Sequence, residues 1–197
     1  MSKTLQLRTA RIFGVAPALH SSDLDRAAAA AIEAARTIDI GRNPILRAWR
    51  KLLEPAGELP APQLLLELAL RSAHLPHPDT IVGACNLVSL RTLAAITAHD
   101  LDRATGDPHL ITTTGRELFH PLGRSRPYRL PPQQWAVIAG GHVLTYLDSR
   151  QSARTQVTLQ TRNVLICVQS PDPAIDDALR QACDAIVTFS GGRVKLD

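Results

Sequence analysis

Two runs of strand-forming residues flank the pair Gly140-Gly141, and this arrangement constrains the fold more than any other feature of the chain. Residues 135–139 and 142–147 are rich in β-branched, aromatic and aliphatic side chains. Glycine accepts a positive φ at both central positions of a primed turn without a steric cost. The stretch therefore predicts a β-hairpin, and with it a sheet in the second half of the chain.

A polar segment follows this hairpin and leads into a further strand that starts near Asn163. Its hydroxyl, carboxylate and guanidinium side chains are Asp148, Arg150, Ser152, Arg154, Thr155, Thr158 and Thr161. Short hydroxyl side chains at this density are typical of a ligand-contacting segment, and equally of a capped, hydrogen-bonded loop. Composition alone leaves both interpretations open.

The composition indicates one globular domain with an aliphatic core. The chain has 197 residues, of which 45% are hydrophobic but only 4% aromatic. A chain of this length can bury a sizeable core in a single domain. The net charge is +4 and most cations are arginines, whose planar guanidinium suits phosphate and carboxylate groups. Nucleic acid or another polyanion is a reasonable partner, although an excess this small favours it only modestly.

Cys85, Cys167 and Cys183 each lie in an apolar run and have no metal-like spacing. We expect buried, reduced thiols, and neither a metal nor a cofactor. The pair His74 and His77, interrupted by proline, lacks a neighbouring acid or thiol and does not favour a metal site. No leader is visible, and no apolar run reaches the ~18 residues of a membrane span. We expect a soluble, cytoplasmic protein that does not associate with membranes.

Helices are predicted mostly in the first half of the chain. Ser22 and Asp25 give a capping signal ahead of an alanine run. The predicted helices are residues 23–37, 45–53, 63–74, 86–97 and about 172–184. Residues 79–83 are expected to form a turn, and His99 to follow the end of the fourth helix. A basic cluster spans the first two helices: Arg36, Arg42, Arg47, Arg50 and Lys51. It is either a phosphate-contacting surface or a solvated helix face.

Strands are predicted at residues 4–15 and 109–114, with 115–117 as a turn, 118–122 as the returning strand and 185–189 as the last strand. Residues 124–132 are expected to be a loop. Helices that precede strands in this way favour an α+β fold with an antiparallel or mixed sheet.

Several short motifs occur in an order that resembles a known family. They are Asn86-Leu87-Val88-Ser89, His99-Asp100-Leu101-Asp102, Gly106-Asp107, Gly115-Arg116-Glu117 with Phe119 and Pro121-Leu122-Gly123, and residues 148–155 followed by Thr158, Thr161 and Asn163. Together they resemble the B3/B4 domain of the phenylalanyl-tRNA synthetase β subunit in its free-standing form, over roughly residues 64–168. The resemblance implies one layered α+β domain across residues 1–197, with a helical part at about 20–75 and a B3/B4 core at about 64–190.

The resemblance also implies a function. In the synthetase this domain hydrolyses the ester of tyrosine wrongly attached to the phenylalanine tRNA. We therefore expect an editing hydrolase that acts in trans on mischarged aminoacyl-tRNA and binds its aminoacylated 3′ end. His99 is similar in position to a histidine that lines the synthetase's editing pocket. The residues expected to bind substrate are Asn86, Gly140, Gly141, Thr158, Thr161 and Asn163.

Two departures from the family pattern concern the amino acid. The synthetase's strand ends in a glutamate that recognises the amino acid, whereas Cys167 or a neighbour occupies that position here. Free-standing members usually have tryptophan and asparagine where this chain has Leu147 and Asp148. The resemblance therefore does not carry tyrosine specificity over to this chain.

An aminoacyl ester is already activated toward hydrolysis. A positioned water and donors to the oxyanion are therefore sufficient to hydrolyse it, and no nucleophilic side chain is required. The residues expected to carry catalysis are His99, Arg150, Ser152, Arg154 and Thr155. In this hypothesis the arginines contact phosphates or the carbonyl oxygen, Ser152, Thr155 and Thr158 order the water, and His99 orients it or binds the amino group.

Other interpretations of these residues stay open. His99 is equally well placed for a helix C-cap, where a cation is favourable. Arg150 and Arg154 are each able to form an internal ion pair with Asp148 or Asp100. The alternative to an enzyme is a non-catalytic module that binds RNA or an amino-acid-like ligand.

Overall fold

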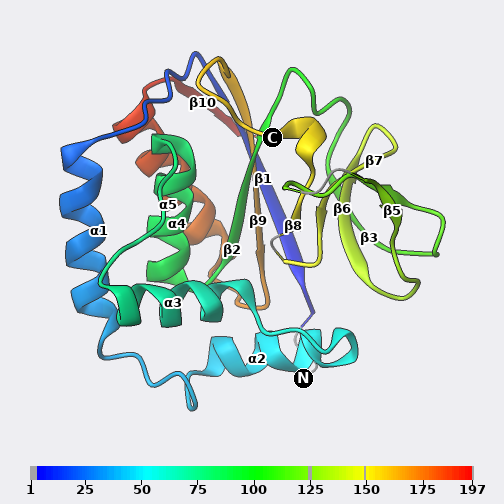
Figure 1. Cartoon of the computed structure of the whole chain (residues 1–197), viewed down its shortest axis with the longest axis horizontal. Coiled ribbons are helices and arrows are strands. Elements are labelled where there is room, and N and C mark those ends of the chain that lie inside the picture. Colours follow the sequence, from blue (N-terminus) through cyan, green and yellow to red (C-terminus); the bar gives the residue numbers. More distant parts are fainter. Residues whose placement is uncertain (1–3, 124–125, 149, 197) are drawn as a thin grey trace.

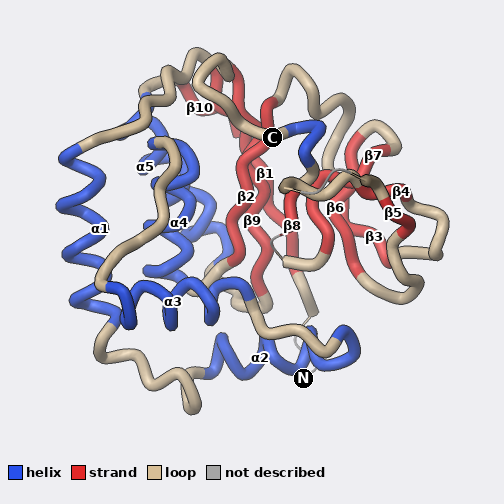
Figure 2. Tube along the Cα trace, in the orientation of Figure 1, coloured by secondary structure: helices blue, strands red, loops and turns tan. Residues whose placement is uncertain are grey.

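The computed structural model describes residues 4–123, 126–148 and 150–196. It is layered: helices cover one face of a central four-stranded sheet, and a second sheet packs on the opposite face (Figure 1; Figure 2). This arrangement confirms the α+β fold, with most helices early in the chain.

The central sheet has the strand order β10-β1-β9-β2 and is antiparallel throughout. Its strands are β1 (Gln6–Phe13), β2 (Ala95–Asp100), β9 (Asn163–Ser170) and β10 (Arg193–Leu196). All six residues of β2 are buried, although β2 is an edge strand. In its register with β9, Thr97 lies beside Cys167 and His99 beside Leu165.

The second sheet has the order β3-β6-β7-β8 and contains the predicted hairpin. Its strands are β3 (His109–Thr112), β6 (Trp135–Ala139), β7 (His142–Tyr146) and β8 (Arg150–Gln151). The turn residues Gly140 and Gly141 have φ values of 53° and 78°, so the primed-turn prediction is confirmed. A separate two-stranded sheet joins β4 (Leu118–Phe119) to β5 (Tyr128–Arg129).

Several of the helices begin at a capping side chain that the sequence supplies. The helices are α1 (Ser22–Ala35), α2 (Pro44–Leu53), α3 (Ala61–Ser72), α4 (Thr80–Thr92) and α5 (Ile175–Ser190), with short 3-10 turns η1 (Glu54–Ala56) and η2 (Ala153–Thr155). Ser21, one residue before the predicted cap, accepts a hydrogen bond from the backbone N–H of Leu24. Asn43 and Asp79 cap α2 and α4 in the same way. Such caps satisfy backbone donors that have no partner inside the helix.

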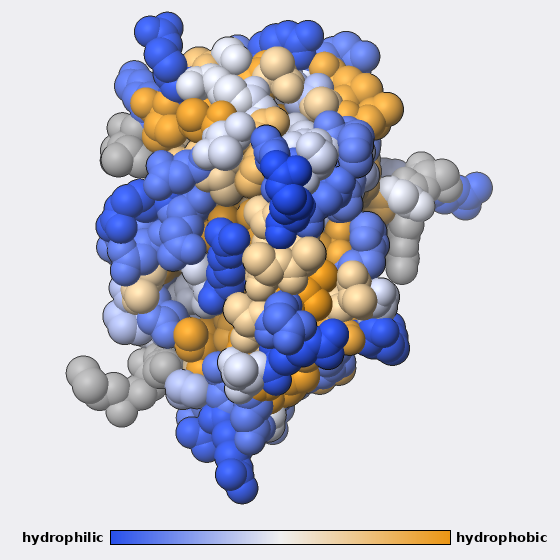
Figure 3. All heavy atoms as spheres, turned by 90° about the vertical axis from the view of Figure 1, so that its left-hand side faces the viewer, coloured by the Kyte–Doolittle hydropathy of each residue, from blue (hydrophilic) through white to orange (hydrophobic). Residues whose placement is uncertain are grey.

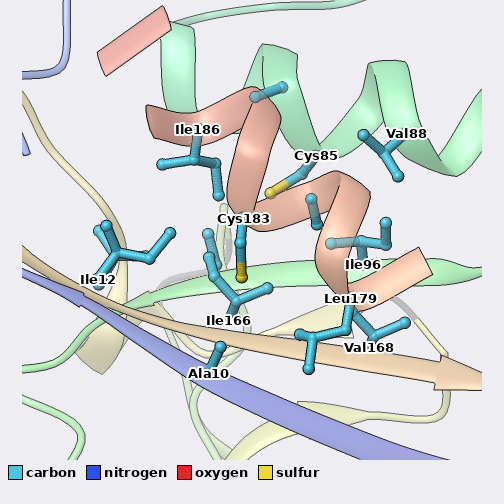
Figure 4. Close-up of a cluster of buried hydrophobic side chains, with 14 of the residues drawn as sticks. Ala10, Ile12, Cys85, Val88, Ile96, Ile166, Val168, Leu179, Cys183 and Ile186 are labelled. Carbon is cyan, nitrogen blue, oxygen red and sulfur yellow. The ribbon is translucent and has the colours of Figure 1, made fainter. Parts of the chain in front are cut away.

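The main core lies between the central sheet and the helices α4 and α5 (Figure 4). Ile12, Ile166 and Ile186 are fully buried there. Cys85, Cys167 and Cys183 are free and buried, as predicted. Burial raises the pKa of Cys167 to about 12, so this thiol is protonated at neutral pH. On the outer face, which α1 forms, hydrophilic and apolar side chains are interleaved (Figure 3).

The helix predicted over residues 86–97 is wrong at both ends. The predicted turn at 79–83 is the cap and first turn of α4, which ends at Thr92. Leu93 then takes a left-handed conformation with a φ of 56°, and β2 begins at Ala95. Both α4 and β2 are buried on nearly all sides, so the sequence from Thr80 to Asp100 is apolar without a clear period. Periodicity therefore cannot separate the helix from the strand. His99 therefore lies in a strand, and the helix C-cap interpretation is wrong.

Three strand assignments also differ from the prediction. Residues 185–189 form the last turns of α5, because its buried face continues through Ile186 to Ser190. The final strand is β10, which the glycines 191 and 192 separate from α5. Residues 118–119 pair with β5 inside the predicted loop, whereas β3 pairs with β6. Pairing between distant segments depends on tertiary packing, which local pattern does not encode.

Candidate functional site

A pocket of about 350 Å³ opens beside the edge strand β2. Its wall is formed by α3, α4, β2, the segment between β7 and β8, and Gln151 of β8. The lining residues are Ala61, Leu64, Leu65, Leu68, Asn86, Ser89, Ala95, Ile96, Thr97, Asp148 and Gln151. We call this space the β2 pocket. Its volume lies at the lower end of the range for small-molecule sites.

Asp148 fixes one side of the β2 pocket by capping α3 from a distant part of the chain. Pro60 precedes α3 and offers no side-chain cap. Instead, Oδ2 of Asp148 accepts a hydrogen bond of 2.5 Å from the backbone N–H of Ala61. A carboxylate at a helix N-terminus is stabilised by the backbone donors and by the helix dipole. The cap holds the start of α3 beside the segment that follows β7.

A buried hydroxyl network connects the pocket wall to His99. Nε2 of His99 lies 3.1 Å from Oγ1 of both Thr97 and Thr145, and Nδ1 lies 2.9 Å from Oγ1 of Thr155. The two hydroxyls of Thr97 and Thr145 are 3.2 Å apart. His99 is fully buried and does not line the pocket, but Thr97 does. Thr97 therefore contacts the imidazole and also lies in the wall of the pocket.

His99 is neutral at physiological pH. Burial lowers its pKa from 6.5 to about 4, because the surrounding groups are uncharged hydroxyls that do not compensate for the loss of water. A neutral imidazole donates from one ring nitrogen and accepts at the other. Hydroxyl partners suit either tautomer, so the network is satisfied without a charge.

The position of β2 at the edge of its sheet adds backbone groups to the site. Because β2 pairs with β9 on one side only, every second residue directs its backbone N–H and C=O away from the sheet. Ala95, Ile96 and Thr97 of this strand lie in the wall of the β2 pocket. Backbone donors at a fixed edge are suited to bind a carbonyl oxygen.

Of the residues expected to bind substrate, Asn86 is in the wall of the β2 pocket. Its Nδ2 donates to the backbone carbonyl of Pro76 at 2.7 Å. Gly140 and Gly141 lie at the other end of β7, in the turn of the hairpin. Gly140 packs so closely against Thr105 that an added Cβ would lie 2.5 Å from its carbonyl oxygen.

Thr158, Thr161 and Asn163 order the loop that precedes β9. Thr161 donates to Oδ2 of Asp100 at 2.8 Å, and its own hydroxyl oxygen accepts from the backbone N–H of Thr158. Nδ2 of Asn163 donates to Asp102 at 3.0 Å. These contacts tie the loop to the end of β2 that is opposite the β2 pocket.

Arg150, Ser152 and Arg154 follow Asp148 in the sequence, and none of the three lines the β2 pocket. Arg150 forms an ion pair with Glu58 and lies 5.5 Å from the centre of the Tyr146 ring. The ion-pair interpretation is thus realised, but with Glu58 as partner. Ser152 is buried, and its hydroxyl accepts from the backbone N–H of Arg154. Arg154 is exposed on η2.

The sequence interpretation missed several residues of the pocket. Thr97 was assigned to a helix, and as a strand residue it faces the same side as His99, two positions later. Leu64 of α3 lines the pocket and is 48% exposed. Asp148 is predicted as part of the polar segment and as a candidate ion-pair partner of the arginines, but not as the residue that caps α3. A strand assignment for residues 95–100 would have placed Thr97 beside His99.

The described residues contain no group of three or more histidines, cysteines or acids able to hold a metal ion. Within the same residues, no helix is both long enough and apolar enough to cross a membrane.

The fold and the pocket define a layered α+β domain with a small-ligand-sized site at the edge of its central sheet. The sequence matches the family model of the B3/4 domain over residues 47–189. The chain therefore belongs to the B3/4 domain family, which confirms the resemblance found in the sequence. A comparison with curated protein sequences gave no match.

A similar solved structure is an N-terminal fragment of the phenylalanyl-tRNA synthetase β subunit from Pyrococcus horikoshii. The identity is 18% and the TM-score is 0.54. The superposition covers 96% of this chain but 46% of that fragment, so this chain spans less than half of its length. At this identity the likeness concerns the fold.

Proposed function

We propose that this protein is a deacylase of mischarged aminoacyl-tRNA, with the acyl group bound in the β2 pocket. The observation that carries the proposal is the position of Thr97: its residue lines the pocket, and its hydroxyl contacts the neutral imidazole of His99. Membership of the B3/4 domain family supports a substrate of this kind, since the family pattern resembles a synthetase editing domain.

The reaction is ester hydrolysis. Water adds to the carbonyl carbon, the bond from that carbon to the ribose oxygen breaks, and the ribose oxygen takes the proton that water releases. Thr97, held by His99, positions the water, and the edge backbone of β2 stabilises the negative charge on the carbonyl oxygen. A positioned oxyanion donor contributes about 3 kcal/mol to such a barrier.

The RNA strand is proposed to approach along Arg150 and Arg154. Arg150 directly precedes Gln151, which lines the β2 pocket, and Arg154 is exposed three residues after it. Exposed arginines suit the phosphates of a 3′ end.

A binding module without catalysis is the second candidate. It is favoured by the makeup of the pocket wall, whose lining residues include neither histidine nor cysteine. The hydroxyl of Ser89, the one serine in that wall, donates to the backbone carbonyl of Ala94 at 2.6 Å. It is therefore not poised as a nucleophile.

Deacylation of a panel of mischarged tRNAs by the purified protein separates the two candidates. Leu64→Trp fills the pocket from a half-exposed position, and Leu118→Trp is its control, since Leu118 is equally exposed but lies on β4. We expect one or more esters to be hydrolysed faster than the spontaneous rate, with the rate lost only in Leu64→Trp. If no ester is hydrolysed while tRNA still binds, the protein is a binding module.

A further inference from the structure

We infer that the β2 pocket recognises an amino acid with an uncharged apolar side chain and holds its α-ammonium group at Asp148. The inference rests on the proposed function for the aminoacyl nature of the ligand. The recognition itself is argued from the chemistry of the wall.

The first argument is charge. Asp148 is the only ionisable residue among those that line the pocket, and its side chain is 5% exposed. A buried carboxylate favours a cationic ligand group and disfavours an anionic one. Its carboxylate accepts from the backbone N–H of Ala61, and this contact holds it in the wall of the pocket.

The second argument is the direction of the hydrogen bonds. Ser89 donates its proton to Ala94, and Asn86 donates from its amide nitrogen to Pro76. Ser89 has therefore committed its single donor and Asn86 one of its two, and both side chains carry acceptor oxygens. Together with Asp148 they form a wall that is rich in acceptors, and the complementary ligand group carries several N–H donors and a positive charge. An α-ammonium group meets both requirements.

The third argument is the apolar part of the wall. Leu64, Leu65 and Leu68 contribute aliphatic side chains from α3, and Ile96 adds one from β2. A charged ligand side chain would lose its hydration there without a partner, whereas an aliphatic or aromatic one gains from the removal of apolar surface from water. The site therefore selects against aspartyl, glutamyl and lysyl groups.

Binding to small amino acid amides tests the inference separately from hydrolysis. The probes are leucine amide, N-acetyl-leucine amide, aspartate amide and lysine amide, measured by isothermal titration calorimetry with the full-length protein. We expect leucine amide to bind at least tenfold more tightly than the other three. Equal binding of N-acetyl-leucine amide, tighter binding of either charged amide, or no binding of leucine amide overturns the inference.

Two matched variants locate the ammonium site. Asp148→Asn keeps an acceptor for the N–H of Ala61 and removes the charge, and it is expected to weaken leucine amide binding at least tenfold. Asp79→Asn is the control, because Asp79 is also a buried helix-capping aspartate but lies outside the pocket wall. An equal loss in both variants contradicts the role of Asp148. If Asp148→Asn does not fold, the comparison of the four amides with the wild-type protein decides.

The outcomes for the two proposals differ. If leucine amide binds as expected but no aminoacyl-tRNA is hydrolysed, the deacylase proposal fails and ammonium recognition stands. If tRNAs that carry aspartate or lysine are hydrolysed as fast as those that carry leucine, the deacylase proposal stands and the inference fails.

Discussion

The hydroxyl of Thr97 lies 3.1 Å from Nε2 of His99, and the same threonine lines the β2 pocket. His99 has no exposed surface, so its chemistry reaches a ligand only through a neighbour. Thr145 contacts the same ring nitrogen at the same distance but does not line the pocket. This pair of threonines allows a structural role of the network to be separated from a catalytic one.

Thr97→Val and Thr145→Val each remove one hydroxyl and preserve the shape of the side chain. We expect both variants to lose about 1–3 kcal/mol in the free energy of unfolding, because each removes a buried hydroxyl that contacts both His99 and the other threonine. Only Thr97→Val should lower deacylation, by about tenfold to a hundredfold. The measurements are urea unfolding and single-turnover deacylation. Equal rates in the two variants would remove Thr97 from the mechanism.

The stability of the fold should decrease on acidification through His99. The pKa of His99 is about 4 in the folded protein, whereas a histidine in the unfolded chain has its ordinary pKa of 6.5. Between these two pH values the unfolded chain therefore binds a proton that the folded chain does not. The contribution of neutral His99 to the free energy of unfolding is fully present above pH 6.5 and is lost as the pH drops toward 4. The total loss is about 3 kcal/mol.

The check is a comparison of urea midpoints between pH 7.5 and pH 4 for the wild type, His99→Gln and His142→Gln. His142 is exposed at the start of β7 and serves as the control. We expect a shallower pH dependence in His99→Gln alone. Parallel curves for all three proteins would show that His99 is not the linked group.

The local signals in the sequence were sufficient for the hairpin and for most helices. The glycine pair fixed the β6–β7 turn, and polar residues at the start of α1 and α2 marked their caps. Local signals failed between Thr80 and Asp100, where a buried helix is followed by a buried edge strand. That error concealed Thr97, since side chains two positions apart share a face in a strand but not in a helix.

The site was less predictable than the fold, because distant segments build it. Family resemblance drew attention to His99 and Thr155, which are in contact at 2.9 Å. The pocket wall, however, combines α3 with residues of β2 and with Asp148, which are held together by a tertiary cap on Ala61. A carboxylate that reaches a helix 87 residues earlier in the chain leaves no periodic signal in the sequence.

The two turn glycines should differ in their tolerance of a side chain. Both have positive φ, so alanine at either position costs about 1–2 kcal/mol of backbone strain. At Gly140 the new Cβ would also lie 2.5 Å from Thr105, whereas at Gly141 it would meet open space. We expect Gly140→Ala to lose about 1–3 kcal/mol more than Gly141→Ala in urea unfolding. Equal losses would show that the loop at Thr105 moves aside freely.

The proposed path of the RNA predicts how salt affects binding. Each phosphate contact contributes about one to the slope of log affinity against log salt concentration. Arg154 is exposed on η2, three residues after the lining residue Gln151, so Arg154→Ala should reduce that slope by about one and weaken tRNA binding at low salt. Arg180→Ala is the matched control, because Arg180 is an exposed arginine on α5 that pairs with Asp177.

Glu58 gives the opposite test on the same surface. It pairs with Arg150 and would compete with a phosphate for that guanidinium, so Glu58→Gln should tighten tRNA binding several-fold and steepen the salt dependence. Filter binding of one tRNA between about 50 and 200 mM salt measures both variants in the range where phosphate contacts dominate. Unchanged slopes in Arg154→Ala and Glu58→Gln would place the RNA on another face of the domain, with the basic cluster of α1 and α2 as the next surface to test.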